Sequence, residues 1–536
     1  MHDLRRAFAA VALALVIAPL VANAALFDPD EGLHAAIAQE MVRNGDYVTP
    51  RFLGEPFLDK PILFFWAEAA SLRLFGDNEF AVRVPPLLLG VAGMLAVALL
   101  ATSLFGPAAG WTAGIAYGTM LLPFGVSQVA VHDIGVIPFM CVACWCLVGA
   151  TRPGAGGLAW RICLAGVALG LSILTKGLVG CVFAAIFAAC LGIRTPSAIP
   201  RLAIVLAGAG VIALLVAAPW YIAMEQAHPG YLHYYFVERH LQGYLTGTQR
   251  HAGRPWWYYV PIVAGGALPW TGYLFIAARE ARADRLRLVL WGWFAIGLAF
   301  LSIGESKLVT YSLPLFPALA LLAGDALARR GPNVADGKGS FQAALTMHAV
   351  FLATVPSAGL ILLQWKFGEA PPFLWPVVLV TLLVTLYAMR RASRSVDANG
   401  LTSWMSAAAI TSLVGLMIVL PHVASWMSAR DLARSLNAGG RLPPRVSVLD
   451  ERIGSIVFYL SPALHTEATP HRLNEASYSE ALVRIRIDPE DAVLAVRNDQ
   501  LERFTKLFLH PPVADERAGT FTVFRMGRLR EALGIE

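Results

Sequence analysis

The sequence predicts a polytopic α-helical membrane protein with a small α/β domain at its C-terminus. Of its 536 residues, 57% are hydrophobic and only 15% are charged, and the mean hydropathy is +0.60. This composition is far too apolar for a soluble protein of the same length. Apolar runs long enough to cross roughly 30 Å of hydrocarbon as helices recur over most of the chain, and the last hundred or so residues change to short strand-like and helical patterns.

The apolar runs predict thirteen membrane spans. The first follows Arg5 and Arg6 and ends near an "ANA" at residues 22–24, so a cleaved signal peptide is the alternative for it. Its apolar core is longer than that of a usual signal peptide, which favours a retained span. The predicted spans lie near residues 7–26, 84–104, 110–126, 134–150, 162–175, 178–193, 202–220, 260–277, 288–303, 308–326, 343–364, 373–389 and 401–421.

Arginine is concentrated in alternate connections between these spans, which orients the chain because short cytoplasmic loops retain basic residues. The short connections on the opposite side carry only Lys176, Lys307 and Lys366. The odd number of spans then leaves the C-terminal segment on the outer face. The net charge of +6 therefore reflects topology, and no nucleic-acid partner is expected. The arginines assigned to the cytoplasm are Arg5, Arg6, Arg152, Arg161, Arg194, Arg201, Arg279, Arg282, Arg285, Arg287, Arg329, Arg330, Arg390, Arg391 and Arg394.

Three regions outside the membrane share the outer face. They are a loop at about 27–83, a second loop at about 221–259, and a tail from 422 onward. The expected division is a transmembrane part at 1–421 and an outer α/β domain at 422–536.

Strand-like segments in the tail predict the α/β domain. "RVSVLD", "SIVFYL", "DAVLAVRN" and "TFTVFRM" are predicted as strands, and "DQLERFTKLFL" has helical spacing. No disulfide is expected there, because all six cysteines fall within predicted spans. Three of them are spaced like metal ligands. Because they are predicted to lie in an uninterrupted apolar helix, they are expected to be small packing residues without a ligand role. They are Cys141, Cys144 and Cys146.

Three carboxylates, Asp28, Asp30 and Glu31, follow directly on the first span. A helix cap would explain one of them, but not all three. Segments 31–43 and 61–75 are predicted as amphipathic helices lying in the membrane interface. A charged turn, Asp59-Lys60-Pro61, lies between them.

The order of several short motifs resembles that of a known family. The first loop contains "PDE", "GDYVTPRFLGEPFLDKPILFFW" and "LFGDNEFAVRVP", and later stretches include "SQVAVHDIG", "TKG", "FVERHLQGYLTGTQRHAGRPWWYYVP", "LPW" and "SKLVTYSLPLFPALALL". This ordered set, over about residues 1–330, resembles bacterial GT-C membrane glycosyltransferases related to the lipid A aminoarabinose transferase and to protein O-mannosyltransferases. Each motif alone is weak, whereas their order is specific.

The resemblance implies an inverting transfer of a sugar from a polyprenyl-phosphate carrier to a periplasmic acceptor. The implied location is the bacterial inner membrane, with the active site on the periplasmic side. The implied acceptor is lipid A or another envelope glycolipid, and membrane lipids surround the chain. Three alternatives remain: a flippase of polyprenyl-linked sugars, a protein O-glycosyltransferase, and a non-catalytic receptor or scaffold. Flippases ordinarily carry their charges among the spans, whereas here the charges collect in outer loops.

The resemblance assigns the catalytic carboxylate to Asp30, as a general base toward an acceptor hydroxyl or as a group that stabilises positive charge on the sugar. Glu31 is grouped with it, although adjacent side chains on a helix diverge, so Glu31 is the better candidate for a structural role. Asp133 is a second acidic candidate, with a helix cap as the alternative.

The carrier phosphate requires cations at the membrane surface. Lys60, in the family's "DKP" position, is the first candidate for this contact, with a snorkelling interfacial lysine as the alternative. Of four further candidates, the two arginines flank an aromatic interfacial run and could bind the phosphate. The lysine and the tyrosine match family positions near the donor, with a plain interfacial role as the alternative for each. The four are Arg250, Arg254, Lys176 and Tyr311.

A divalent metal, zinc or magnesium, is compatible with the sequence but not required. Asp59 and His251 match family positions near such an ion. The chain departs from the family three residues after Asp30, where Leu33 replaces a usual arginine and His34 follows. Loss of that cation is expected to raise the pKa of the aspartate unless His34 replaces it in part.

Overall fold

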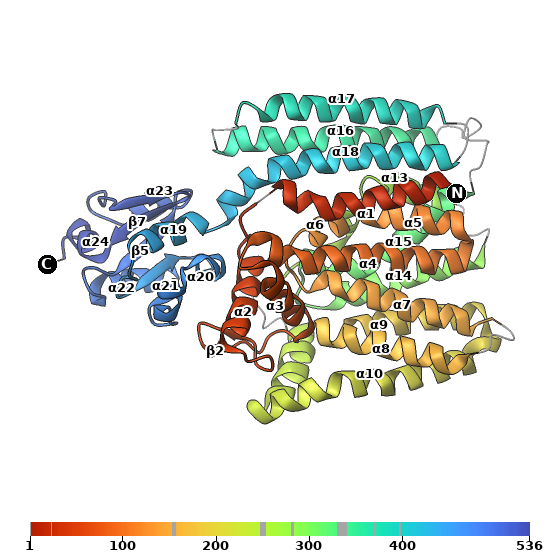
Figure 1. Ribbon diagram of the computed structural model, residues 1–536, viewed down its shortest axis with the longest axis horizontal. Helices are drawn as coiled ribbons and strands as arrows, with labels where there is room; N and C mark the ends of the chain where they lie inside the picture. The colour runs from red at the N-terminus through yellow and green to blue at the C-terminus, as the bar shows by residue number, and fades with distance from the viewer. Residues whose placement is uncertain are drawn as a thin grey trace. The chain divides into compact units, whose positions relative to one another are not determined.

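The computed structural model (Figure 1) describes residues 2–22, 24–152, 157–246, 253–279, 284–329, 340–367, 371–395 and 398–535. The chain divides into two compact units, each built from separate stretches of sequence. Unit 1 comprises Met1–Ala22, Leu58–Phe64 and Arg83–Val419, and unit 2 comprises Asn23–Phe57, Phe65–Val82 and Leu420–Glu536. The first outer loop thus contributes residues to both units, which the contiguous division at residue 421 does not anticipate.

Unit 1 is entirely helical among its described residues. Two of its helices, α4 and α18, extend beyond its bounds. The helices are α1 (His2–Ala22), α4 (Glu79–Phe105), α5 (Pro107–Thr119), α6 (Leu121–Ser127), α7 (Asp133–Ala150), α8 (Leu158–Lys176), α9 (Val179–Arg194), η1 (Pro196–Ala198), α10 (Ile199–Ala227), η2 (His233–Gln242), α11 (Gly243–Leu245), α12 (Tyr259–Gly266), α13 (Thr271–Arg279), α14 (Arg285–Ile303), η4 (Val309–Leu315), α15 (Phe316–Ala328), α16 (Ser340–Phe367), α17 (Leu374–Ser393) and α18 (Ala398–Ala424).

Nine helices in the described parts of the chain are long and apolar enough to cross a membrane, and the count is ten if α12 and α13, bent by 104°, form one span. All thirteen predicted segments are helical, but three lie outside this count. The predicted span at 110–126 is divided at Met120, whose backbone is extended. The one at 178–193 corresponds to the 16-residue helix α9, and the first corresponds to α1. The chain is a multi-pass membrane protein.

The spans differ in how they are buried. Helix α7 and the η4–α15 segment are enclosed by other helices, whereas α10, α16 and α17 present most of their surface outward. Helices α16, α17 and α18 run alongside one another (Figure 1). Polar side chains at the start of α7 and in η4 therefore belong to the interior of unit 1.

Unit 2 contains the described α/β elements. Most of α3 belongs to it, and the other elements come from the first outer loop and the tail. They are α2 (Asp30–Asn44), β1 (Arg51–Phe52), β2 (Glu55–Pro56), α3 (Leu63–Phe75), η6 (Ser425–Met427), α19 (Arg430–Ala438), β3 (Val446–Leu449), α20 (Gly454–Tyr459), α21 (Pro462–Glu467), β4 (Leu473–Ala476), α22 (Tyr478–Ile487), β5 (Val493–Arg497), α23 (Leu501–Thr505), β6 (Glu516–Ala518), β7 (Phe521–Arg525) and α24 (Met526–Leu533).

The tail forms a five-stranded mixed sheet with the order β4-β3-β5-β7-β6. The β4-β3-β5 part is parallel and the β5-β7-β6 part is antiparallel. The sheet buries an apolar core with α22, α23 and α24, which contains Leu494, Phe504, Phe524 and Leu529. This confirms the predicted α/β domain and three of its four predicted strands.

The fourth predicted strand, "SIVFYL", is wrong, because residues 454–459 form the helix α20. A short buried apolar run has the same appearance in a strand and in a buried helix, so periodicity does not distinguish them. Strands β4 and β6 are absent from the prediction, since their sequences are short and polar.

Helix α2 packs on α20 at a point where only glycine fits. A Cβ on Gly32 would lie 2.4 Å from the amide nitrogen of Ser455, and a Cβ on Gly454 would lie 2.3 Å from that of Leu33. Almost every residue from Glu31 to Met41 is buried by protein. The prediction of α2 as an interfacial helix with one exposed polar face is therefore wrong.

This close approach lets α20 bind the first carboxylate of the acidic stretch. The Ser455 amide donates to Asp28 Oδ1 at 3.0 Å, and the Ser455 hydroxyl donates to Oδ2. Burial of the carboxyl outweighs these hydrogen bonds and raises the pKa of Asp28 to about 7. Asp28 is thus a structural residue of unit 2.

The first prediction concerns the pH dependence of unit 2. Because the fold raises the pKa of Asp28 above its ordinary 3.8, its contribution to stability is complete below that value and is lost as the pH rises through about 7. The apparent unfolding temperature of the purified protein in detergent should therefore fall between pH 5.5 and pH 8. Asp28→Asn, which mimics the protonated carboxyl, should flatten this part of the profile.

Asp46 in the same unit provides a matched control. Burial acts to raise the pKa of Asp46, but hydrogen bonds from the amides of Thr49 and Val48 lower it overall. Its stabilising contribution is therefore constant above pH 4, and Asp46→Asn should lower the unfolding temperature equally at pH 5.5 and pH 8. An unchanged pH profile in Asp28→Asn would contradict the assignment.

Candidate functional site

The ten residues predicted for the site are distributed unevenly over the structure. Asp30 and Glu31 belong to unit 2, and Arg250 and His251 lie outside the described residues. The other six belong to unit 1, and five of them are linked through a polar cluster at the ends of helices. The six are Asp59, Lys60, Asp133, Lys176, Arg254 and Tyr311.

The centre of the cluster is an ion pair between Asp133 and Lys176. Helix α7 begins at Asp133 and the neighbouring helix α8 ends at Lys176, so each charge sits at the helix end whose dipole favours it. Thr310 of η4 also donates a hydrogen bond to Asp133. The Lys176 ammonium lies 4.3 Å from the ring centre of Tyr311. Three sequence motifs, "VHD", "TKG" and "VTY", therefore converge here.

Lys60 lies near this ion pair and forms no ion pair of its own among the described residues. It is within electrostatic range of Asp133 and of His240. Among the described residues, no carboxylate forms an ion pair with Lys60, and its side chain is only half-buried. A lysine in this position is available to bind an added anion.

Asp59, the neighbour of Lys60, is held by η2. Its Oδ1 accepts a hydrogen bond from the Tyr234 hydroxyl at 2.5 Å, and its Oδ2 pairs with Arg239 at 3.0 Å. The helix η2 is a π-helix, in which residues five apart are bonded neighbours. Tyr234 and Arg239 are five apart, so one carboxylate receives both side chains. Asp59 thus fastens the turn that carries Lys60.

The same spacing brings Tyr235 against His240. Their ring centres are 4.4 Å apart, and His240 Nδ1 lies 2.6 Å from the Tyr235 carbonyl oxygen. Since a carbonyl only accepts, Nδ1 carries the proton and Nε2 is free of one in the neutral imidazole. Nε2 faces Gly177, where a Cβ would come within 2.9 Å and where φ is +73°. Glycine in the "TKG" motif thus leaves room for the imidazole.

Cations surround this imidazole. Burial lowers the pKa of His240, and the charges of Lys60, Arg239 and Lys176 lower it further. The histidine is therefore neutral at pH 7, and the three cations lie within electrostatic range of the region around it. A phosphate group entering that region would meet several charge-assisted donors.

Arg254, unlike these cations, has an exposed side chain. Its exposed guanidinium lies 5.8 Å from the ring centre of Tyr258. Its carbonyl oxygen lies 3.4 Å from the ammonium of Lys307, a buried side chain that also donates to the Gly304 carbonyl at 2.5 Å. The backbone of Arg254 is thus anchored while its side chain extends outward.

Among the described residues, the surroundings of Asp59 do not fit the metal site that the family resemblance implied for it. Both oxygens of Asp59 are occupied, one by a hydroxyl and the other by the guanidinium of Arg239. No group of three or more His, Cys, Asp or Glu side chains that would hold a metal occurs in the described part of the chain. A divalent ion at Asp59 would compete with the Tyr234 hydroxyl and the Arg239 guanidinium for the carboxylate.

The acidic stretch in unit 2 separates into three different environments. Asp30 is exposed at the first residue of α2. Glu31 is buried and accepts a hydrogen bond from the Phe27 amide at 2.8 Å, a local structural contact. His34 is also buried and packs edge-to-face on Phe65. Of the residues that carry charge here, Asp30 is the one presented to solvent.

A buried glutamate of α3 lies near Glu31 and has no counterpart in the sequence predictions. Glu68 is completely buried, and neither carboxyl oxygen has a hydrogen-bond partner among the described residues. Burial, and then the charge of Glu31, raise the pKa of Glu68 well above its ordinary value. The buried Glu68 carboxyl therefore favours its protonated form.

Sequence reasoning did not single out Tyr234, Arg239 or His240, although Arg239 and His240 lie in the quoted stretch "FVERHLQ" and Tyr234 comes just before it. Their relation depends on a five-residue repeat, which is invisible to an analysis based on the α-helical period of 3.6. The adjacent ionisable residues Glu238, Arg239 and His240 were the available signal.

Comparison with known proteins places the chain among membrane glycosyltransferases. Residues 59–222 match the family model described as dolichyl-phosphate-mannose-protein mannosyltransferase. The chain is 30% identical to an undecaprenyl phosphate-alpha-4-amino-4-deoxy-L-arabinose arabinosyl transferase of Pseudomonas aeruginosa (strain LESB58), over 90% of this chain and 91% of the relative. It is also 30% identical to the transferase of that name from Enterobacter sp. (strain 638), over 79% of this chain and 73% of the relative.

Solved structures agree on the fold. The crystal structure of ArnT from Cupriavidus metallidurans bound to undecaprenyl phosphate matches with a TM-score of 0.75, at 24% identity, over 96% of this chain and 97% of that one. The apo structure of the same protein matches with a TM-score of 0.73. By its sequence similarity over nearly the whole length, the chain belongs to the family of undecaprenyl phosphate-alpha-4-amino-4-deoxy-L-arabinose arabinosyl transferases.

Proposed function

We propose that this chain is a glycosyltransferase that moves a pentose, such as 4-amino-4-deoxy-L-arabinose, from undecaprenyl phosphate to a glycolipid of the bacterial cell envelope. Lipid A is the proposed acceptor. Family membership and the ArnT-like fold support the reaction class and the carrier. The protein O-glycosyltransferase alternative differs only in the acceptor.

The observation that carries this proposal is that Lys60, within a cluster of cations, forms no ion pair among the described residues. Lys60, Lys176 and Arg239 all act on His240, whereas Lys176 and Arg239 are already paired with carboxylates. A phosphate monoester leaving group carries up to two negative charges, so it needs a free cation and further donors nearby. We assign the carrier phosphate to Lys60, with Tyr311 and Arg254 as additional contacts.

The proposed reaction is a single displacement. An acceptor oxygen forms a bond to the anomeric carbon, the bond from that carbon to the carrier phosphate breaks, and undecaprenyl phosphate leaves with the electron pair. Asp30 accepts the proton when the acceptor is a hydroxyl. When the acceptor is an ionised phosphate, no proton is transferred, and Asp30 stabilises the positive charge that develops on the sugar. Attack opposite the leaving group inverts the anomeric configuration.

The proposed topology has thirteen crossings. It counts the nine long spans, the bent pair α12–α13, and the shorter segments α1, α5–α6 and α9. This arrangement leaves the arginine-rich connections in the cytoplasm and the reaction on the periplasmic side of the inner membrane.

An assay with purified protein in detergent tests the function directly. Undecaprenyl-phosphate-linked aminoarabinose and lipid A should yield a new glycosidic product. Replacing lipid A with acceptor proteins tests the O-glycosyltransferase alternative. A flippase would form no product in detergent, where there is no membrane to cross, and absence of product with every acceptor would refute the proposal.

Asp30→Asn should abolish transfer while the affinity for undecaprenyl phosphate stays unchanged, because Asp30 is proposed to act on the sugar and the acceptor. Product formation and carrier binding are measured on the same preparation. Glu31→Gln is the matched control, and it should lose less activity because Glu31 holds the Phe27 amide. Near wild-type turnover in Asp30→Asn would remove Asp30 from the mechanism.

Lys60→Ala should weaken binding of undecaprenyl phosphate by roughly tenfold to a hundredfold, since a charge-assisted contact contributes about 1.5 to 3 kcal/mol. Lys60→Arg should fall between the alanine variant and the wild type, because the planar guanidinium presents its donors in another geometry. Lys506→Ala, at an exposed lysine of α23's C-terminal end, is the control. Unchanged affinity in Lys60→Ala would rule out the phosphate role.

Asp59 and Arg239 should behave as one unit in a double-mutant cycle. Asp59→Asn and Arg239→Gln each release the turn that carries Lys60, so each should weaken carrier binding severalfold, and the double variant should lose little more than either single one. The exposed pair Arg43–Asp77, changed in the same way, should leave affinity unaffected. Additive losses at Asp59 and Arg239 would instead mean that Arg239 binds the phosphate independently of Asp59.

A further inference from the structure

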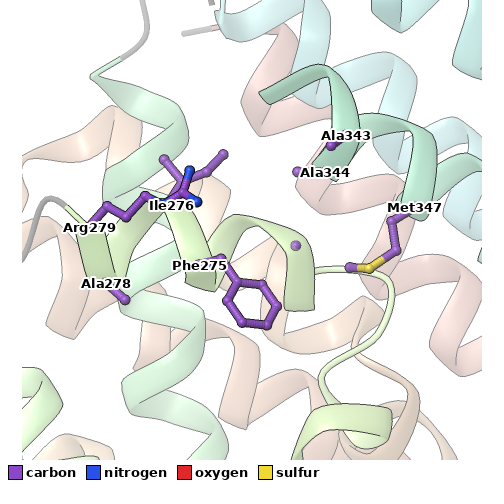
Figure 2. Close-up of a pocket in the computed structure, with 8 residues that line it drawn as sticks. Phe275, Ile276, Ala278, Arg279, Ala343, Ala344 and Met347 are labelled. Carbon is purple, nitrogen blue, oxygen red and sulfur yellow. The ribbon is translucent and has the colours of Figure 1, made fainter. Parts of the chain in front are cut away.

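A recess lies between α13 and α16, away from the polar cluster. It has a volume of about 700 Å³. Figure 2 shows its two walls, with Phe275, Ile276 and Arg279 on one helix and Ala344 and Met347 on the other. Apart from Arg279 the labelled lining is apolar. Both helices belong to candidate membrane spans, so hydrocarbon chains are the surrounding medium.

The helices touch at a glycine beside the recess. A Cβ on Gly272 would lie 2.9 Å from both the Cα and the Cβ of Ala344. Phe275, one turn further along α13, stays 67% exposed and does not fill the space. The packed glycine contact therefore fixes the separation of the two helices and leaves an open, apolar recess next to it.

Arg279 places a positive charge at the end of this recess. It is exposed in the last turn of α13, and no carboxylate in the described part of the chain pairs with it. The arginines of two neighbouring helix ends are different, since Arg287 and Arg329 both bind the buried Asp325 at 2.9 Å. Arg279 thus differs from them in having no carboxylate partner among the described residues.

We propose that this recess binds an anionic phospholipid, with its phosphate on Arg279 and an acyl chain against Phe275, Ile276 and Met347. An apolar recess in a span is filled by hydrocarbon, and a basic residue at its rim selects a lipid with net negative charge. A zwitterionic lipid presents a phosphate too, but its own ammonium offsets the attraction. The predicted topology places Arg279 on the cytoplasmic side, where anionic lipids of that leaflet are available.

Lipid binding to the delipidated full-length protein tests this site. Native mass spectrometry with phosphatidylglycerol and phosphatidylethanolamine should show preferential retention of phosphatidylglycerol. Arg279→Gln should weaken phosphatidylglycerol binding by about fivefold, the effect of one basic residue near a lipid surface worth about 1 kcal/mol. Binding of phosphatidylethanolamine should change little.

Two further variants separate the recess from general surface charge. Ala343 lines the recess and is exposed, so Ala343→Phe should fill the space and reduce retention of both lipids while keeping Arg279. Arg285, an exposed arginine at the start of α14 outside the recess, is the control, and Arg285→Gln should bind as the wild type does. Equal losses in Arg279→Gln and Arg285→Gln, or no preference between the lipids, would overturn the proposal. Dimers that disappear with Ala343→Phe would assign the recess to a second copy of the chain instead.

Discussion

The accommodation of charge at the ends of apolar helices is the constraint on which unit 1 depends. An ionised group near hydrocarbon must be paired or solvated, because an uncompensated charge in a low dielectric is costly. Asp133 and Lys176 meet this requirement through each other, as do Asp59 and Arg239. Asp133 and Lys176 each lie at a helix end whose backbone dipole favours the charge. Lys60 is the exception among the described cations of the cluster, because no carboxylate forms an ion pair with it. The cluster is therefore suited to bind an anion.

A different constraint, steric and not electrostatic, organises unit 2. The contact of Gly32 with Ser455 and of Gly454 with Leu33 brings two helices closer than any side chain allows. Residues far apart in the sequence thereby share hydrogen bonds, and the carboxylate of Asp28 is satisfied by α20. The acidic stretch after the first span therefore contains both structural and exposed carboxylates. Asp28 and Glu31 stabilise the fold, and Asp30 stays exposed.

The polar cluster and the lipid recess illustrate two uses of basic residues in one membrane protein. In the cluster, cations converge from separate elements on a common region around His240. At the recess a single arginine stands at the end of an apolar surface. The first arrangement suits a compact, highly charged phosphate that must be bound and released in each turnover, and the second suits a lipid whose affinity comes mainly from its acyl chain. Arginines that are already paired within the protein, as Arg287 and Arg329 are with Asp325, serve neither to bind a phosphate nor to bind a lipid.

The sequence by itself determined the membrane class, the helical character of all thirteen apolar segments, the α/β tail and the family, because hydropathy and ordered motifs depend on local composition. It also pointed to Lys60, Asp133, Lys176 and Tyr311, since each ends or flanks an apolar helix. Only the tertiary structure decided that "SIVFYL" is a helix, that α2 is buried, and that Tyr234, Arg239 and His240 join the cluster. A short apolar run is ambiguous until its neighbours are known, and burial of α2 depends on a helix more than 400 residues away in the chain. The pairing of η2 with Asp59 follows from a π-helical repeat that packing imposes and that no local pattern encodes.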